Sequence, residues 1–188
     1  MTVAFYSRTL VPCLPSSPTP SSSSAPACIP SYVYRVHHAS SQAKYSFTTG
    51  FRAKNQTTIL DGKSILDRFG LAHLHHQTNI SSPLISVYDS RVRAEQVAYY
   101  YFAPKYPGED IFIVTIDTQH LARGPVFRAA DILKDSSPSA SSAEDWLHEG
   151  EYLLMYKIPM QAIRTDEKVW RERGNVDQSA LAPIGTRL

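Results

Sequence analysis

Four short apolar runs along the chain have the pattern of β-strands. Residues 32–36 are mostly β-branched and aromatic, and residues 83–88 form a second run of this kind. Residues 111–116 and 152–158 are apolar at both alternating positions, which is typical of strands covered on both faces. We therefore expect these two to be the central strands, and Pro159 to end the second because proline donates no ladder hydrogen bond.

Helical spacing appears between these runs. Residues 59–69 carry apolar side chains on one helical face, with Asp61 or Ser64 as possible N-caps and Gly70 as the predicted stop. Asp89 or Ser90 is the predicted cap of a second helix. The apolar positions of this second helix follow at i, i+3, i+4 and i+7, at Ala94, Val97, Ala98 and Tyr101.

Composition separates a folded middle from two polar ends. Residues 1–31 are so rich in Pro and Ser that we expect a disordered leader, because such a segment buries too little apolar area to offset its ordering entropy. Residues 32–174 are the predicted domain, with an exposed Ser-rich loop at 135–142. Residues 175–188 are predicted to be an irregular C-terminal tail.

Charge and hydropathy narrow the classes of partner. The net charge of +2 comes from scattered basic residues, not from a dense basic patch, which argues against nucleic-acid binding. No run approaches the roughly 18 apolar residues of a transmembrane helix. We expect a cytoplasmic or nuclear protein, while secretion and organelle import stay open because the N-terminus is Ser-rich and poor in acidic residues.

Four polar residues at the predicted strands are candidates for chemistry. Glu149 and Glu151 stand at i and i+2, so in an extended chain both carboxylates would point to one side and could share a site. Arg35 must reach solvent or find an anion, and Ser86 needs a hydrogen-bond partner within its apolar run. Each also has a simpler interpretation. The two glutamates could belong to a solvated loop end, Arg35 to a surface ion pair, and Ser86 could be an ordinary hydroxyl.

Histidines form the other conspicuous group. His73, His75 and His76 lie close together in the sequence, and histidine is a common metal ligand. No Cys or carboxylate completes a ligand set at familiar spacing, so we predict no metal site and interpret these side chains as the polar rim of a loop.

The order of the candidate residues resembles a known family. Arg35 on a first strand, Ser86 on a second and Glu149-x-Glu151 before a third resemble the Arg-Ser-Glu signature of cholera-toxin and heat-labile-enterotoxin-like ADP-ribosyltransferases. Residues 48–51 correspond to the Gly-containing segment of that family. The resemblance implies an α+β fold, a split β-sandwich of two small sheets with flanking helices. The chain is also similar to a family of uncharacterised fungal domains.

What this resemblance implies is a mono-ADP-ribosyltransferase or NAD glycohydrolase. It would transfer ADP-ribose from NAD, its substrate, to a side chain of an unidentified target protein, with arginine as the implied acceptor. Arg35, preceded by Tyr34, would bind the NAD phosphates and the adjoining ribose. Ser86 would hold the nicotinamide ribose, and no metal is implied.

The remaining roles implied by the family fall on the residues before the last strand. Glu151 would stabilise an oxocarbenium-like transition state, and Glu149 would activate the acceptor. Trp146 would contact the target protein, or else cover the edge of the core. Residues 86–88 keep only the first hydroxyl of the Ser-Thr-Ser common in toxin-like members. The alternative is therefore a catalytically inactive interaction module.

Overall fold

The computed structural model describes residues 29–60, 62–77, 79–121, 124–136 and 145–169. The predicted leader up to residue 28, the predicted cap Asp61, most of the Ser-rich loop and the predicted tail lie outside these residues. Among the described residues, no helix is both long and apolar enough to cross a membrane.

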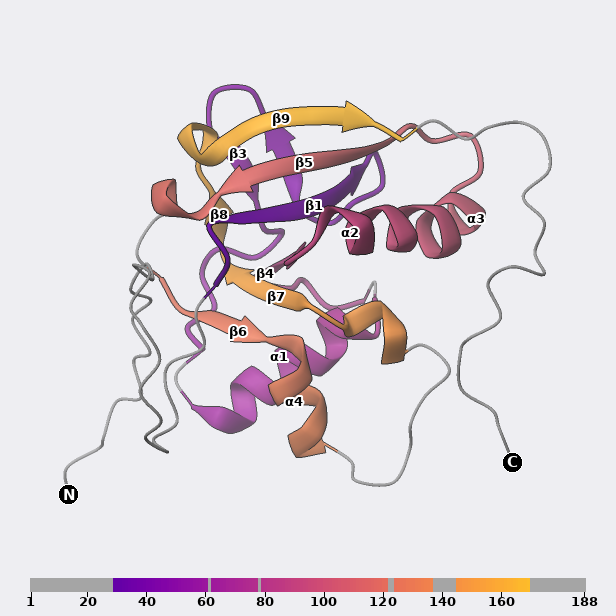
Figure 1. Ribbon diagram of the computed structural model, residues 1–188. Coiled ribbons are helices and arrows are strands. Elements are labelled where there is room, and N and C mark those ends of the chain that lie inside the picture. The colour runs from indigo at the N-terminus through magenta and orange to yellow at the C-terminus, as the bar shows by residue number, and fades with distance from the viewer. Residues whose placement is uncertain (1–28, 61, 78, 122–123, 137–144, 170–188) are drawn as a thin grey trace, which may run out of the picture.

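Two antiparallel sheets form the framework (Figure 1). The larger has six strands in the order β6-β7-β4-β1-β5-β9, and the smaller has three in the order β2-β3-β8. The strands of the larger sheet are β1 (Tyr32–His38), β4 (Leu84–Tyr88), β5 (Ile111–Asp117), β6 (Val126–Arg128), β7 (Glu151–Met155) and β9 (Ile163–Lys168). Those of the smaller are β2 (Lys44–Ser46), β3 (Gly50–Arg52) and β8 (Lys157–Ile158).

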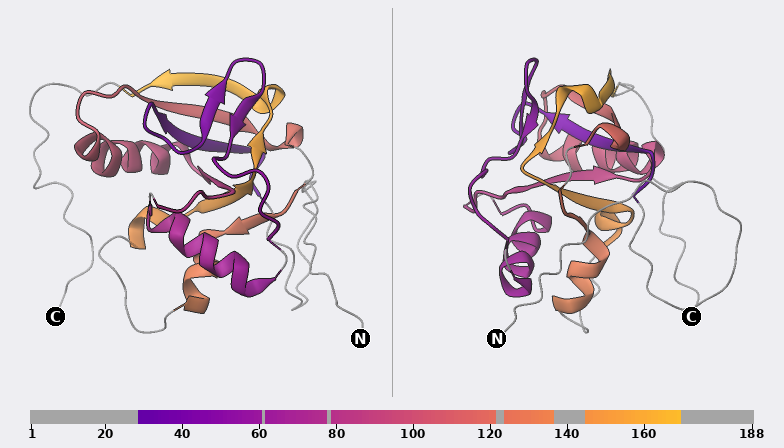
Figure 2. Two further views of the ribbon diagram at one scale, coloured as in Figure 1. Left: turned by 180° about the vertical axis from the view of Figure 1, so that it is seen from behind. Right: turned by 90° about the vertical axis from the view of Figure 1, so that its left-hand side faces the viewer.

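The helices form two groups around the larger sheet. The α-helices are α1 (Lys63–Leu74), α2 (Arg91–Val97), α3 (Ala103–Lys105) and α4 (Ala129–Ser136), with a π-helical segment η1 (Ala98–Phe102) that joins α2 to α3. The described residues also form the 3-10 helices η2 (Thr118–His120), η3 (Asp145–His148) and η4 (Met160–Ala162). Figure 2 shows α1 and α4 side by side next to β6 and β7, while α2 and α3 lie elsewhere on the sheet.

The predicted α+β class and the four predicted strands are confirmed, with differences at their ends. The run at 152–158 forms two strands in different sheets, because Tyr156 between them adopts φ 62° and turns the chain. The pair at the centre of the larger sheet is β1 and β4, so β5 and β7 lie one place further out than predicted.

The predicted helices also form, and Ser90 caps the second by accepting a hydrogen bond from the Arg93 amide. The predicted stop at Gly70 is wrong, since α1 continues to Leu74. Gly70 is buried against α4, where an added Cβ would lie 2.8 Å from the Ile132 side chain. This glycine therefore lies in the contact between α1 and α4 and does not end the helix.

Alternation along β1 divides the core into layers. Val33 packs with Phe51 and Ile158 of the smaller sheet, whereas Val36 packs with the face that α2 covers. A third apolar cluster joins α1 and α4 to the sheet around Leu74. Side chains at neighbouring positions of a strand point to opposite faces, so one strand serves both layers.

The larger sheet is split between its two central strands. β1 and β4 share a single backbone register pair, Tyr34↔Tyr88, whereas β1 pairs with β5 along all seven of its residues. From the Tyr34–Tyr88 pair, β1 continues toward His38 while the antiparallel β4 extends back toward Leu84. Along these stretches the two strands form no further register pair. This separation places a cavity inside the sheet, beside the residues that the sequence singled out.

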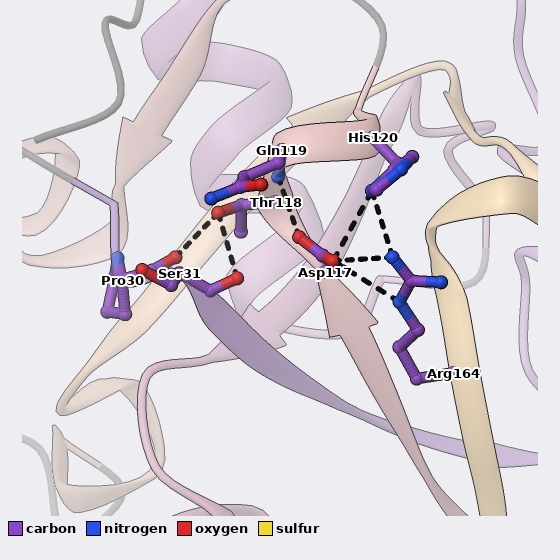
Figure 3. A network of polar contacts seen from close by, with 7 residues as sticks. All are labelled: Pro30, Ser31, Asp117, Thr118, Gln119, His120 and Arg164. Atoms are coloured by element: carbon purple, nitrogen blue, oxygen red, sulfur yellow. Dashed lines mark hydrogen bonds and ion pairs between the residues drawn. The ribbon is translucent and has the colours of Figure 1, made fainter.

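A polar network fixes the opposite end of the sheet (Figure 3). Arg164 at the start of β9 donates from Nε and Nη2 to Asp117 Oδ2, at 3.2 and 2.7 Å. Thr118 Oγ1 donates to the carbonyl oxygens of Pro30 and Ser31, at 2.8 and 3.1 Å. The ends of β5 and β9 and the segment before β1 are thereby held together.

We expect Asp117→Asn to lower the free energy of unfolding by about 1–2 kcal/mol, the lower part of the range for charged hydrogen bonds, since Arg164 is partly exposed. The hydrogen bond from Arg164 lowers the pKa of Asp117, so its stabilisation is present above the unfolded pKa and is lost as pH falls through the folded pKa. Urea denaturation at several pH values measures both effects. Asp166→Asn, at an exposed position of β9, is the control. Equal losses in the two variants would contradict this role.

Candidate functional site

The cavity in the split sheet has a volume of about 110 Å³. Its walls come from β1, β4, the loop after β1, the end of α1, and the aromatic segment from η1 to Tyr106. Among the described residues that line it, Arg35 is the one Arg or Lys, and no Asp or Glu takes part. The site therefore presents one guanidinium surrounded by hydroxyl, amide, imidazole and aromatic groups.

Arg35 is buried within the split, with 6% of its surface exposed. Its Nη1 donates to the carbonyl oxygen of Ser86 at 3.0 Å, and its guanidinium carbon lies 5.0 Å from the centre of the Phe51 ring. Burial lowers the pKa of Arg35 to about 10, which leaves the group cationic at neutral pH. Arg35 Nε is buried and has no hydrogen-bond partner, so this cation is only partly satisfied by the protein.

Ser86 lies on the opposite wall and is held by a residue from another element. Its Oγ is 2.9 Å from Nε2 of His73, which lies in the last turn of α1. Burial, followed by the charges of neighbouring groups, lowers the pKa of His73 to about 3. The imidazole is therefore neutral at physiological pH, and it orients the Ser86 hydroxyl without adding charge to the cavity.

His76 belongs to the same wall. Its ring stacks on Tyr101 with centroids 4.9 Å apart, and burial lowers its pKa to about 4. The prediction that these histidines form the polar rim of a loop is thus partly wrong, because His73 lies in α1 and both His73 and His76 line the cavity. The spacing of three residues, one helical turn, was the available signal in the sequence. Within the described residues, no three His, Cys, Asp or Glu side chains come together as a metal site.

Glu151 lies at the start of β7, directly opposite Tyr88 of β4. Only 4% of its surface is exposed, and its Oε2 is 2.6 Å from Nδ1 of His148. Its charge raises the pKa of Arg35 against the larger effect of burial, so the two groups interact electrostatically. Glu151 does not itself line the cavity, although the adjoining Tyr88 does.

Glu149 is separated from Glu151 by a sharp turn. Gly150 between them adopts φ 67°, so the chain is not extended and the prediction that both carboxylates share one side is wrong. The Glu149 side chain is 73% exposed and pairs with Arg93 of α2. Glu149 and Arg93 line a separate open hollow of about 270 Å³ beside the start of α2.

Two other predicted site residues lie outside the cavity. Tyr34 packs half-buried against the apolar layer beneath α2, on the face of β1 opposite to Arg35. Trp146 of η3 packs half-buried against the same layer, which matches the alternative that it covers the edge of the core. The structure therefore brings together Arg35 and Ser86, with Glu151 adjacent, and separates Glu149, Tyr34 and Trp146 from them.

Comparison with known proteins places this geometry in a wider context. A family model described as a domain of unknown function (DUF7587) matches residues 28–171. The chain belongs to this family. A solved structure named EcPltA superposes on this DUF7587 domain with a TM-score of 0.52 and 14% identity, covering 77% of this chain and 78% of that chain. The DUF7587 domain thus has the fold of ADP-ribosyltransferase toxins. The comparison with curated proteins found no match.

Three partly buried histidines predict a stability that falls in mild acid. The pKa values of His37, His73 and His76 are lowered to about 4, 3 and 4, chiefly by burial. As pH falls below about 6.5, the unfolded chain takes up protons first, so each imidazole lowers the free energy of unfolding by at most about 1.4 kcal/mol per pH unit.

We expect His73→Gln to flatten this pH dependence, as measured by urea unfolding between pH 7 and about 4.5. His75→Gln changes an exposed residue of the same segment and should leave the slope unchanged. A wild-type slope retained in His73→Gln would show that His73 is protonated equally in the folded and unfolded states.

Proposed function

We propose that this DUF7587 domain binds NAD at the cavity of the split sheet and transfers ADP-ribose to a protein side chain. The observation that carries the proposal is Arg35, whose guanidinium lines the cavity beside Ser86 on the fold of ADP-ribosyltransferase toxins. A guanidinium N–H is a strong donor to phosphate and ribose oxygens. NAD glycohydrolysis is the same reaction with water as the acceptor.

The reaction breaks the bond between the nicotinamide nitrogen and C1′ of the ribose, and the electron pair of that bond leaves with nicotinamide. A nitrogen of the acceptor forms the new bond to C1′ and gives up one proton to a carboxylate. Positive charge develops on the ribose between these events, and a nearby carboxylate stabilises it, as in glycosidases. We assign this role to Glu151, which shares a face of β4 and β7 with Ser86.

Glu151 would act after exchanging its hydrogen bond to His148 for one to the ribose 2′-hydroxyl. His73 would hold the Ser86 hydroxyl in position against the same ribose, in a chain where Val87 and Tyr88 stand in place of the Thr and the second Ser of the family pattern. In this assignment Arg35 binds, Ser86 orients and Glu151 stabilises charge.

Glu149 suits an acceptor from solution because its carboxylate is exposed. Arginine is the acceptor that fits best, since a guanidinium bonds readily to a carboxylate and Arg93 already pairs with Glu149. An acceptor arginine would replace Arg93 at this carboxylate and lose its proton there.

A catalytically inactive interaction module is the second candidate function. It is favoured by the two carboxylates, since Glu151 is buried against His148 and Glu149 is paired with Arg93. The cavity of about 110 Å³ is also smaller than the roughly 300 Å³ or more of typical small-molecule pockets. In such a module the fold would serve binding to another protein, with Arg35 retained to stabilise the split sheet.

We expect the full chain to release nicotinamide from NAD, and Glu151→Gln to reduce the rate about 100-fold or more, because the glutamine keeps the shape but loses the charge. Release is measured by chromatography, with and without agmatine as a guanidine acceptor. Glu149→Gln should lose transfer to agmatine and retain hydrolysis.

Glu95→Gln, on the exposed side of α2, is the control for a loss of surface charge. Equal release by wild type and Glu151→Gln would contradict the enzymatic proposal. Absence of release from a wild-type chain with native circular dichroism would favour the interaction module.

A further inference from the structure

The smaller sheet gathers basic residues that lie far apart in the sequence. Lys44 of β2, Arg52 of β3 and Lys157 of β8 are register partners across its three strands, as Lys44↔Arg52 and Arg52↔Lys157. Residues directly opposite each other on antiparallel strands share a face, with Cβ atoms about 4.5–5.5 Å apart. All three side chains are exposed. Three cations therefore form a row across one face of this sheet, which we call the basic row.

The opposite face of the same sheet belongs to the core. Phe51 and Ile158, at the alternating positions of β3 and β8, are fully buried in the first apolar cluster. Side chains at neighbouring positions of a strand point to opposite faces, so the basic row points away from the core. Ala53 is buried next along the chain and Lys54 is exposed, which continues the alternation beyond β3. Lys54 thus adds a fourth cation, two residues from Arg52.

These four cations have no carboxylate partner among the residues that the structure describes. Lys44 Nζ donates to a backbone carbonyl oxygen at 2.9 Å, and Arg52 Nη1 donates to the neutral Gln56 side chain at 3.3 Å. The segments that carry the cations, residues 39–60 and 156–163, contain no Asp or Glu. Like charges directly opposite each other destabilise a sheet, so a bound anionic surface would relieve their repulsion.

An exposed aromatic side chain lies at the tip of the same hairpin. Phe47 belongs to the turn between β2 and β3, and 79% of its surface is exposed. The Thr49 amide closes this turn by donating to the Ser46 carbonyl oxygen at 3.2 Å, and the hydroxyls of Ser46 and Thr48 lie 3.1 Å apart. Figure 2 shows the hairpin projecting from the body of the molecule. The turn therefore presents the Phe47 ring to the surroundings, close to the basic row.

An anionic membrane surface fits both features. Anionic lipid headgroups attract basic side chains, and each one near the surface strengthens binding about fivefold. The boundary between headgroups and acyl chains takes up exposed aromatic rings, because it offers them an apolar environment. An acidic protein segment would pair with the basic row but would give Phe47 no role. The combination of a cationic face and a projecting apolar ring therefore favours a lipid surface as the partner.

We propose that the basic row, together with Lys54 and Phe47, is a docking surface for membranes that contain anionic lipids. None of these residues lines the cavity of the split sheet. Docking is thus a property beyond the proposed function and does not depend on it. The attachment is peripheral and reversible, since it uses a few cations and one ring.

The test is cosedimentation of the full chain with two kinds of vesicle, phosphatidylcholine alone and phosphatidylcholine with about 30% phosphatidylserine. We expect saturable binding to the anionic vesicles and none to the neutral ones. Binding should weaken as NaCl rises from about 0.1 to about 0.5 M, because salt screens the attraction between the cations and the headgroups. Absence of binding to the anionic vesicles, or equal binding to both kinds, would overturn the inference.

Arg52→Gln combined with Lys157→Gln should weaken binding to the anionic vesicles about 25-fold, two factors of about five. Arg68→Gln combined with Lys134→Gln is the matched control, because it removes one Arg and one Lys from exposed positions of α1 and α4. This control should change binding less than about threefold, since its charges lie away from the basic row. Circular dichroism of each variant verifies the fold. Equal losses in the two double variants would show that binding follows net charge alone and would reject the docking surface.

Phe47→Ser should weaken binding to the anionic vesicles about tenfold, because the apolar ring no longer enters the membrane boundary. Val92→Ser, which removes an exposed apolar side chain from α2, is its control and should bind as wild type does. Unchanged binding by Phe47→Ser would contradict the role of the hairpin tip. Binding to single-stranded RNA in place of vesicles, lost in the Arg52 and Lys157 double variant, would assign the basic row to nucleic acid and overturn the inference.

Discussion

The burial of one guanidinium in the middle of a β-sheet is the constraint on which the site depends. β1 and β4 share one register pair and then diverge, and Arg35 bridges the opening by donating to the Ser86 carbonyl. That bond gives a backbone acceptor of β4 a side-chain donor at the place where the register pairs of β1 and β4 stop. The same cation is only partly satisfied, since its Nε has no partner and burial lowers its pKa. The guanidinium that bridges the split sheet thus also lines the cavity.

Around this cation the cavity is kept free of other charge. His73 and His76 carry pKa values well below neutrality, so at physiological pH they act as neutral hydrogen-bonding and stacking groups. In a medium of low polarity, a single cation in the wall of a cavity favours an electron-rich ligand. The price is acid sensitivity, because each neutral imidazole is protonated more readily in the unfolded chain.

The two glutamates illustrate how one residue between them changes their chemistry. Gly150 at φ 67° turns the chain, so that Glu151 enters β7 and is buried against His148 while Glu149 stays on the surface with Arg93. A carboxylate near the cavity and a second one reachable by a macromolecule are what the proposed transfer requires of Glu151 and Glu149. A catalytically inactive interaction module would show the same separation of the glutamates. Nicotinamide release distinguishes such a module from an enzyme.

The sequence by itself determined the elements and the order of the candidate residues. Apolar runs and a Ser90 cap located four strands and two helices because their periodicity is local, and the order of Arg35, Ser86 and Glu151 pointed to the fold. Tertiary structure decided what local patterns do not encode: the split between β1 and β4, the turn at Gly150 that parts the glutamates, and the packing of Gly70 against α4. It also brought His73 to Ser86 and aligned Lys44, Arg52 and Lys157 across the smaller sheet. These features arise from contacts between residues far apart in the chain, and no spacing within one segment specifies them.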